Sequence, residues 1–281
     1  MRALSPQPHA DHRRVLGGRV AVVTGGASGI GRALAVALDA VGCRVVLGDI
    51  EKVALDDTVN EMRAWGSSVI GVQCDVRSTE DMEELAHQAH TQCGPVDIVC
   101  LNAGVSPSGS VLETSAATWR WLIDVNLLGV VNGISAFVPG LVQRKSGHVV
   151  ITGSLAGLIP TPSLGPYSAV KHAVGALAEV LQTELTDTGV HVSLVCPGAV
   201  RTRIAESERN RPSEFPGASH ADPQLAQRYR EAVAASTTQP DHVASAVLEA
   251  LLENRFLVLP SPEGPSMVAE RLKELQSAIG A

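Results

Sequence analysis

Short hydrophobic runs alternate with longer stretches of helical periodicity along most of the chain. The runs consist almost entirely of apolar residues, many of them β-branched. Between the early runs, at residues 30–41, 51–65 and 78–93, apolar side chains recur every three or four positions. The runs themselves cover residues 19–24, 44–49, 68–75, 96–102, 147–153, 190–196 and 255–260.

This alternation predicts one domain built on a parallel sheet. Strands that alternate with helices are joined by βαβ crossovers, which make neighbouring strands parallel. Because helices then cover both faces of the sheet, its strands need no polar face. We therefore predict an α/β fold, a single doubly wound parallel sheet with helices on both faces, over residues 18–262. A polar arm is expected at residues 1–17 and a helical tail at residues 263–281.

One polar stretch interrupts the alternation at residues 203–236. It is rich in Arg, Glu, Ser and Pro and stands between a predicted strand and a predicted helix. Such an insertion is either a disordered loop or a lid over a site, and its place in an otherwise compact domain favours a lid. The first part of the stretch is interpreted as a solvated face, in which Arg203 is the candidate to face inward.

Composition and charge narrow the partners and the compartment. The formal net charge is −7 and there is no basic cluster, which argues against nucleic acid or an anionic membrane as partner. No apolar run is long enough to cross a bilayer, and residues 1–14 lack the apolar region of a secretory signal. The five cysteines form no CxxC pair, so we interpret them as reduced residues packed inside a cytoplasmic protein.

The stretch TGGASGIGRA at residues 24–33 joins the first predicted strand to the first predicted helix. Gly25, Gly29 and Gly31 let a pyrophosphate approach the backbone, where a Cβ would block it. The free N–H groups at the start of the following helix also attract phosphates. Glycine serves ordinary turns as well, but the order of strand, turn and helix favours a nucleotide site.

Asp49 ends the second predicted strand, where a carboxylate accepts hydrogen bonds from the ribose of an adenosine. The same carboxylate repels a 2′-phosphate, and no basic residue lies inside the glycine loop, where Ser28 precedes Gly29. We therefore expect NAD rather than NADP. The alternative role for Asp49 is an N-cap of the next helix, and the two roles can coexist.

The stretch YSAVK at residues 167–171 places Tyr167 and Lys171 one helical turn apart on the same face. A nearby ammonium favours the phenolate and lowers the pKa of a tyrosine, which suits proton exchange near neutral pH. The alternative is an amphipathic helix with both side chains at its solvent edge. Ser154 ends the preceding strand at the edge of the sheet where ligands bind, and so favours the catalytic interpretation.

Together these motifs resemble the classical short-chain dehydrogenase/reductase family from about Val20 to about Pro260. Further motifs add to the resemblance, although Leu101 replaces the first asparagine of the family's usual NNAG. The resemblance implies a Rossmann-type domain that binds a nicotinamide dinucleotide and assembles as a homotetramer. The motifs are TGGASGIG at 24–31, CDV at 74–76, NAG at 102–104, DVNLLGV at 124–130, YSAVK at 167–171 and CPGAVRT at 196–202.

The resemblance also assigns site residues. It implies catalytic roles for Asn126, Ser154, Tyr167 and Lys171, with Val200 and Thr202 holding the nicotinamide carboxamide. The implied nucleotide-binding residues are Gly25, Ser28, Gly29, Ile30, Gly31, Asp49, Asp75, Val76, Asn102, Ala103, Gly104, Tyr167, Lys171, Pro197, Gly198, Val200 and Thr202.

We therefore predict an NAD-dependent oxidoreductase that interconverts a secondary alcohol and a ketone. Tyr167 would exchange the hydroxyl proton, Ser154 would hold the substrate oxygen, and Lys171 would lower the tyrosine pKa and bind the nicotinamide ribose. Asn126 would hold a water that links Lys171 to solvent. The apolar segment at residues 155–166 favours a neutral, largely apolar substrate.

Two alternative functions remain open. An NADPH-preferring carbonyl reductase is opposed by Asp49, and a non-catalytic NAD-sensing protein is opposed by the presence of both Tyr167 and Lys171. The reductase would differ from the favoured function in its cofactor, and the sensing protein would differ in having no turnover. Kinetics with both cofactors can therefore distinguish all three functions.

Two further groups of residues receive weaker interpretations. His87, His90 and Cys93 share a helical face, but no fourth ligand lies nearby in the sequence, so no metal is expected. Trp119 and Trp121 precede the predicted catalytic asparagine and either line the substrate site or pack at a subunit contact.

Overall fold

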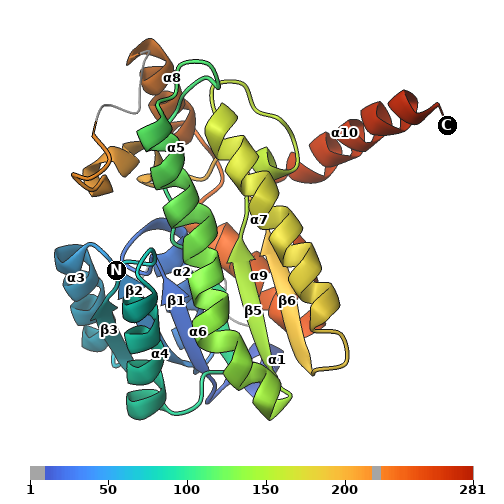
Figure 1. Ribbon diagram of the computed structural model, residues 1–281. Coiled ribbons are helices and arrows are strands. Elements are labelled where there is room, and N and C mark those ends of the chain that lie inside the picture. The colour runs from blue at the N-terminus through green and yellow to red at the C-terminus, as the bar shows by residue number, and fades with distance from the viewer. Residues whose placement is uncertain (1–9, 217–222, 281) are drawn as a thin grey trace.

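The computed structural model describes residues 10–216 and 223–280, and within them seven parallel strands form one sheet (Figure 1). The strand order is β3-β2-β1-β4-β5-β6-β7, so the chain winds first one way from β1 and then the other way from β4. This confirms the predicted doubly wound α/β fold. The strands are β1 (Val20–Thr24), β2 (Arg44–Asp49), β3 (Val69–Gln73), β4 (Ile98–Leu101), β5 (Gly147–Thr152), β6 (Val190–Val195) and β7 (Leu257–Val258).

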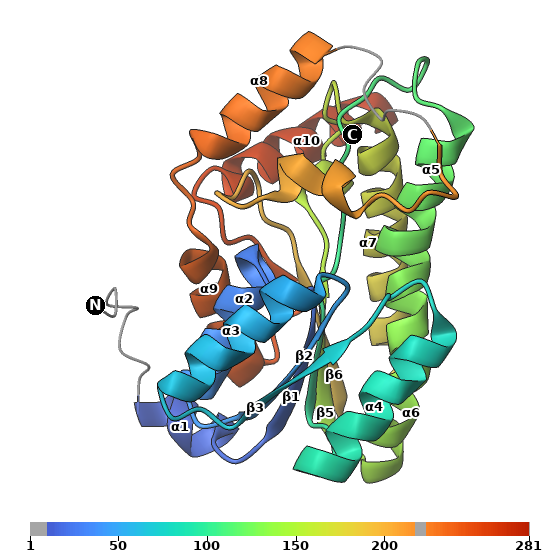
Figure 2. The ribbon, with the colours of Figure 1, turned by 90° about the vertical axis from the view of Figure 1, so that its left-hand side faces the viewer.

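Helices cover both faces of the sheet, which is why its central strands are apolar on both sides (Figure 2). On one face α2, α3 and α9 pack against the sheet, and on the other face α4, α6 and α7 do so. Each face has its own buried cluster, built mainly from Val, Leu and Ala. These helices are α2 (Gly29–Ala40), α3 (Lys52–Ala64), α4 (Thr79–Cys93), α6 (Gly129–Arg144), α7 (Gly165–Glu184) and α9 (Pro240–Glu253).

The two edge strands are shorter than the hydrophobic runs suggested. β3 takes up five residues of the run at 68–75, and β7 takes up two residues of the run at 255–260. An edge strand has a neighbour on one side only, so fewer hydrogen bonds extend it. The apolar runs continue past these strands because their side chains still pack against the core.

The predicted polar arm at residues 1–17 needs correction in its second part. Residues Ala10–Leu16 form helix α1, in which His12 and Leu16 are 5% and 1% exposed. These two residues lie one turn apart, so together they give α1 a buried face, and α1 contacts α9. The first nine residues of the arm lie outside the described residues.

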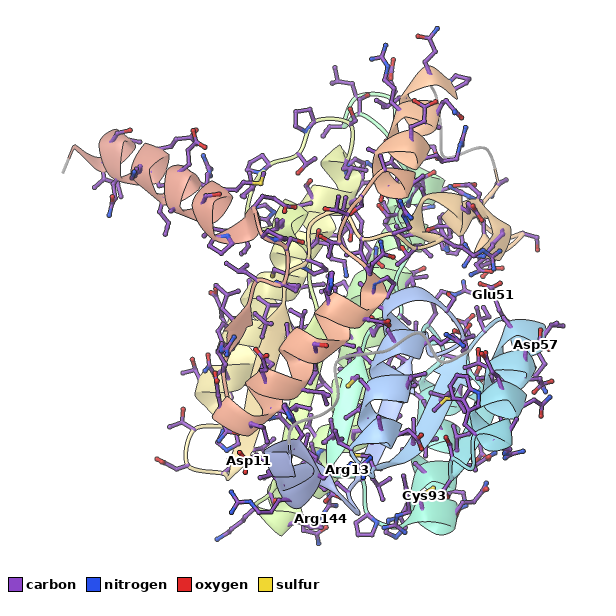
Figure 3. All side chains as sticks on the ribbon, turned by 180° about the vertical axis from the view of Figure 1, so that it is seen from behind. Asp11, Arg13, Glu51, Asp57, Cys93 and Arg144 are labelled. Atoms are coloured by element: carbon purple, nitrogen blue, oxygen red, sulfur yellow. The ribbon has the colours of Figure 1, made fainter. Side chains whose placement is uncertain are left out.

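The predicted tail and lid appear as separate elements at the carboxyl ends of the strands. The tail forms α10 (Gly264–Ile279), which extends away from the domain and buries only Gly264 (Figure 3). The lid contains the 3₁₀ helix η3 (Ile204–Asn210) and α8 (Pro223–Ala234). Residues 217–222 of the lid are not among the described residues.

One long apolar helix ends in α6, on the face of the sheet that α4 and α7 also cover. It runs from Ala116 to Arg144 and consists of α5 (Ala116–Ile123), the π-helix η1 (Asp124–Leu128) and α6. Among the described residues it is the one helix long and apolar enough to cross a membrane, with a mean hydropathy of 1.7, and 39% of its apolar window is buried. Its inner face belongs to the core, whereas Leu128 and Val131 on its outer face are exposed.

Candidate active site

The loop between β1 and α2 packs so closely that its glycines have no room for a side chain. Gly25 and Gly29 have positive φ angles of 65° and 53°, which other residues rarely adopt. A Cβ on Gly31 would lie 2.0 Å from the carbonyl oxygen of Gly25. The loop therefore presents bare backbone in front of the first turn of α2, an arrangement that suits a phosphate group.

A cleft of about 460 Å³ runs along the carboxyl edge of the sheet, from the glycine loop to the lid. Every predicted catalytic or nucleotide-binding residue lines it except Gly31 and Asn126. The lining residues follow different strands, and the parallel sheet brings them together because all its strands end at this edge. The cleft includes the loops after β1 and β4, where the strand order reverses, and ligands bind at such a point in doubly wound sheets.

Asp49 stands at one end of the cleft and is held by the main chain. Its Oδ2 accepts the N–H of Ala27 at 2.9 Å, and its Oδ1 accepts the N–H of Glu51 at 2.9 Å. Burial raises the pKa of Asp49, while these two N–H groups and the charge of Arg209 oppose that rise. Glu51, not Asp49, is the N-cap residue of α3, so the capping role considered for Asp49 is not observed.

The segment after β3 forms another part of the same end of the cleft. Arg77 binds both carboxylate oxygens of Asp75, with 2.6 Å between Nη2 and Oδ2, and Asn132 donates to the carbonyl of Val76 at 2.9 Å. The other arm of Arg77 binds Glu214 of the lid at 2.6 Å. The lid is thus tied to the wall that carries Asp75 and Val76.

Hydrogen bonds connect the glycine loop to the middle of the cleft. The side-chain amide of Asn102 donates to the carbonyl of Thr24 at 3.1 Å and accepts the hydroxyl of Thr152 at 3.1 Å. The carbonyl of Thr152 in turn accepts the ammonium of Lys171 at 2.7 Å. Asn102 therefore positions the strand ends on either side of it, and Thr152 fixes Lys171.

Ser154, Tyr167 and Lys171 meet in the middle of the cleft. Ser154 follows β5, while the other two residues stand one turn apart near the start of α7. Ser154 lies close enough to Tyr167 to lower the pKa of the phenol, and Nζ of Lys171 lies 5.8 Å from the centre of the Tyr167 ring. A phenol, a hydroxyl and an ammonium thus share one site, so the solvent-edge alternative for this pair does not describe the structure.

The predicted lowering of the Tyr167 pKa is not what this structure shows. Burial raises the pKa of Tyr167, Tyr229 adds to the rise, and the nearby Ser154 opposes it. Lys171 is 4% exposed, and burial lowers its own pKa to about 8. The loss of hydration in the cleft therefore outweighs the attraction between phenolate and ammonium.

Asn126 lies behind the cleft wall, fully buried in the π-helix η1. Its Oδ1 accepts the N–H of Val105 at 2.9 Å, and its Nδ2 donates to the carbonyl of Val105 at 2.8 Å. The side chain therefore positions Val105, which lines the cleft. The water link from Asn126 to Lys171 stays a prediction.

The other end of the cleft is mostly apolar and is formed in part by the lid and the tail. Val105, Trp121, Val233 and Met267 line it. Trp121 is fully buried, with the guanidinium of Arg211 4.6 Å from its ring centre. Of the two roles considered for this tryptophan, the structure supports lining the site.

A polar cluster in this apolar end was not predicted from the sequence. Tyr229 of α8 donates its hydroxyl to Oγ of Ser106 at 2.9 Å, and the N–H of Ser106 donates to Oγ of Ser207 at 3.0 Å. Ser106 and Tyr229 are 123 positions apart, and no motif connects them. The one available signal was that Tyr229 is the second of only two tyrosines in the chain.

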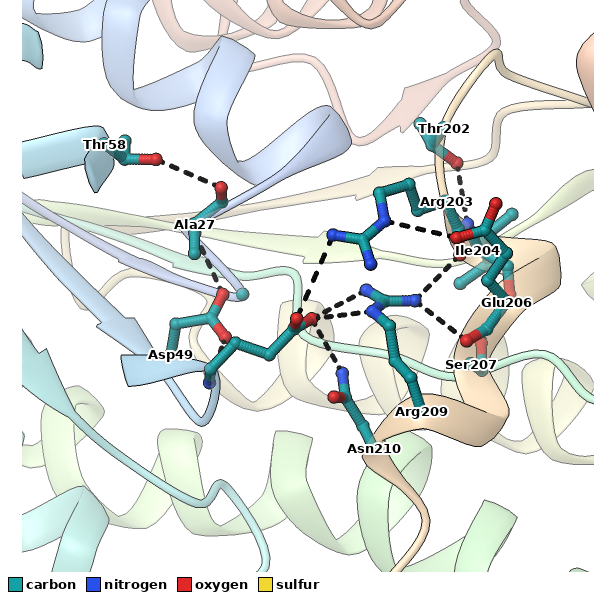
Figure 4. A network of polar contacts seen from close by, with 12 residues as sticks. Ala27, Asp49, Thr58, Thr202, Arg203, Ile204, Glu206, Ser207, Arg209 and Asn210 are labelled. Atoms are coloured by element: carbon teal, nitrogen blue, oxygen red, sulfur yellow. Dashed lines mark hydrogen bonds and ion pairs between the residues drawn. The ribbon is translucent and has the colours of Figure 1, made fainter. Parts of the chain in front are cut away.

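The lid also reaches the end of the cleft where Asp49 stands, and Figure 4 shows Arg203, Arg209 and Asn210 on the side facing it. Oε1 of Glu51 accepts Nε and Nη2 of Arg209 at 3.0 and 2.7 Å and Nδ2 of Asn210 at 3.0 Å. Oε2 lies 4.0 Å from Nη1 of Arg203, so Arg203 faces the cleft even though half of its side chain is exposed. The sequence indicated neither Glu51 nor Arg209 as a site residue.

The positions of His87, His90 and Cys93 do not form a metal site in the described structure. His87 and His90 are exposed, whereas Cys93 is buried on another side of α4. In the part of the chain that the structure describes, no three His, Cys, Asp or Glu side chains are grouped so that they could hold a metal ion. All five cysteines are free and buried.

Comparisons with known proteins show the family to which this chain belongs and the solved structures that it resembles. The profile of the short chain dehydrogenase family matches residues 19–213. A short-chain dehydrogenase/reductase from Burkholderia phymatum, solved in complex with NAD, has a TM-score of 0.90 and 36% identity, over 94% of this chain and 96% of that one. An alcohol dehydrogenase from Thermococcus sibiricus, complexed with 5-hydroxy-NADP, has a TM-score of 0.70 and 30% identity, over 86% of this chain and 95% of that one.

A longer relative shares the same region. The glycine betaine reductase ATRR of Emericella nidulans is 35% identical over 93% of this chain. The chain spans only 20% of that relative's length, so it is similar to one part of a larger protein.

Proposed function

Because the chain belongs to the short-chain dehydrogenase/reductase family of oxidoreductases, we propose that it interconverts a secondary alcohol and a ketone with NAD as the hydride carrier. The observation that carries this proposal is the meeting of Ser154, Tyr167 and Lys171 in a cleft that has Asp49 at its far end. The first three residues suit the exchange of a proton, and Asp49 suits the adenosine of a dinucleotide.

The cleft fits an extended dinucleotide. Gly25 and Gly29 would hold its pyrophosphate against bare backbone, Asp49 its adenosine ribose, and Lys171 its nicotinamide ribose. When bound, NAD supplies the chemistry of accepting a hydride from the alcohol carbon.

The protein's own groups would manage the proton and the charge on oxygen. In oxidation, Tyr167 would accept the substrate hydroxyl proton, and in reduction it would return that proton. Ser154, which lines the cleft beside Tyr167, would donate to the substrate oxygen and stabilise the negative charge that develops on it. The ammonium of Lys171, fixed by Thr152, would favour the phenolate.

A panel of secondary alcohols with NAD, followed through the absorbance of the reduced cofactor, tests the reaction class. We expect neutral, apolar or alicyclic alcohols to be the best substrates, because Val105, Trp121 and Val233 line the substrate end. Much faster turnover of sugars or of hydroxy acids with a carboxylate would contradict this substrate class. Binding of NAD without turnover of any substrate would favour the NAD-sensing alternative.

The cofactor proposal gives a prediction for Asp49. The wild-type protein should prefer NAD over NADP by at least tenfold in kcat/KM, which corresponds to about 1.4 kcal/mol. Replacing Asp49 with Ala should narrow this preference, because the carboxylate that repels a 2′-phosphate is gone. Steady-state kinetics with both cofactors measure the change. Equal turnover of the wild type with NADP would refute the prediction.

An NADP-dependent reductase is the second candidate, and a specific observation favours it. Arg203 and Arg209 line the cleft close to Asp49, although neither lies in the glycine loop. Guanidinium groups are good phosphate ligands, so positive charge at this end is what a 2′-phosphate requires. These two arginines are already bound to Glu51, which is why NAD remains the favoured cofactor.

The exposed apolar side chains of two helices support a homotetramer. Leu128 and Val131 on the long helix and Val180 on α7 are 44%, 36% and 54% exposed. We expect these helices to pair across two-fold axes, which would cover the side chains. Light scattering should give the mass of a tetramer, and Val180→Glu should reduce it.

Val53→Glu on α3 is the matched control for the assembly test. Val53 is 76% exposed but stands apart from the two helices, so the control variant should remain a tetramer. A monomeric wild type at micromolar concentration would refute the proposed assembly. The free, buried cysteines support the cytoplasm as the compartment of this assembly.

A further inference from the structure

The side chain of Glu51 is bonded to residues of the lid. Three N–H donors of Arg209 and Asn210 converge on its Oε1, at 2.7 to 3.0 Å, and its side chain is only 23% exposed (Figure 4). Burial acts to raise the pKa of Glu51, but the bonds from Arg209 and Asn210 outweigh it and lower the pKa. The carboxylate is therefore ionised at neutral pH, and it forms ion pairs with arginines of the lid.

Arg209 has little freedom to bind anything else. Its Nη1 donates to the carbonyls of Arg203 and Glu206 at 3.0 Å each, while Nε and Nη2 bind Glu51. The guanidinium group of Arg209 is thus hydrogen-bonded on both sides, and the side chain is 24% exposed. Arg203 is held less firmly, between Glu206 at 3.2 Å and Glu51 at 4.0 Å.

Two carboxylates and two guanidinium groups lie close together at this end of the cleft. Asp49 and Glu51 supply two carboxylates, and Arg203 and Arg209 supply two guanidinium groups, all four of which line the cleft. Arg209 lies near enough to Asp49 to lower the pKa of that carboxyl group. If Glu51 were neutral, Arg209 would lose its carboxylate partner.

We propose that Glu51 is a second determinant of nucleotide choice, which holds Arg209 and Arg203 in ion pairs and so denies them to a phosphate on the adenosine ribose. The inference rests on the proposed use of a nicotinamide dinucleotide. Asp49 would repel the 2′-phosphate directly, and Glu51 would act indirectly by pairing with Arg203 and Arg209. Neutralising Glu51 would release a fork suited to bidentate phosphate binding.

Equilibrium titration of NAD and NADP, by calorimetry, tests this without relying on turnover. Glu51→Gln should bind NADP about tenfold more tightly than the wild type does, while its affinity for NAD should change by less than about threefold. Because Glu51 makes no side-chain capping bond to α3, the variant keeps the helix start. In Glu51→Gln combined with Arg209→Leu, the gain for NADP should disappear.

Asp56→Asn is the matched control, since it removes one negative charge from the same helix α3. Asp56 pairs with Lys52 on the exposed side of the helix, so its loss should leave the ratio of the two affinities unchanged. An equal loss of NAD and NADP affinity in Glu51→Gln would show that Glu51 only fastens the lid, and an unchanged ratio would likewise overturn the inference. A wild type that binds neither nucleotide would instead refute the proposed function itself.

Discussion

Replacing Tyr167 with Phe should lower kcat for alcohol oxidation at least 10²-fold, the lower range for a positioned acid or base. The change keeps the ring in the cleft and removes only the phenolic oxygen that would exchange the proton. Because the glycine loop, Asp49 and Lys171 are untouched, the affinity for NAD should stay within about twofold. Stopped-flow or steady-state kinetics, together with an NAD titration by fluorescence, measure both quantities.

The second tyrosine of the chain provides the control for this experiment. Tyr229 also carries a buried hydroxyl beside the cleft, but that hydroxyl binds Ser106. Tyr229→Phe should therefore alter KM while it leaves kcat within about tenfold of the wild type. Near-normal turnover in Tyr167→Phe would mean that another group exchanges the proton.

The pH profile of oxidation should follow the protonation of Tyr167. Burial raises the pKa of this phenol, so it is protonated at neutral pH, and the base form needed for oxidation increases as the pH rises. The rate of oxidation should therefore increase with pH through the neutral range. Tyr167→Phe should lose this increase, and a flat wild-type profile would contradict the assignment.

Replacing Lys171 with Met should weaken NAD binding at least tenfold and at the same time stabilise the fold. The ammonium is 4% exposed, and burial lowers its pKa from 10.5 to about 8. At about 1.36 kcal/mol per pKa unit, this corresponds to a cost of about 3 kcal/mol for the charged form. Loss of the hydrogen bond to Thr152 would offset about 1 kcal/mol of the gain, so a net stabilisation of about 2 kcal/mol is expected.

The pH dependence of that stabilisation has a definite sign. Between about pH 8 and the pKa that Lys171 has in the unfolded chain, Lys171 binds more protons in the unfolded state than in the folded state. The stability that Lys171 contributes therefore rises with pH. The gain in the free energy of unfolding of Lys171→Met over the wild type should thus be largest below about pH 8 and should decrease above it. Urea denaturation at several pH values measures it.

An exposed lysine supplies the control for the lysine prediction. Lys273→Met on α10 removes a charge of the same sign from the surface and should change neither stability nor NAD affinity. If Lys171→Met were destabilised at neutral pH, the cost assigned to the buried ammonium would be wrong.

The sequence alone predicted the elements and much of the cleft, because both depend on local patterns. Apolar runs and helical periodicity repeat at short range, so β1, β2, β5, β6 and α2 to α4 could be placed nearly to the residue. The motif residues follow strand ends, and a parallel sheet brings such ends to one edge. Asp49, Ser154 and Lys171 therefore share a cleft for a reason that is visible in the sequence.

Other properties were decided only by the tertiary structure, because they depend on groups distant in the chain or on burial. Glu51 and Arg209 are 158 positions apart, and the sequence does not indicate that the lid folds back onto the end of β2. Asn126 bonds the main chain of Val105, 21 positions away, and the sequence did not indicate this contact. The spacing of Tyr167 and Lys171 indicated a lowered tyrosine pKa, yet the pKa is raised, because hydration lost on burial is a property of the whole fold and not of a spacing.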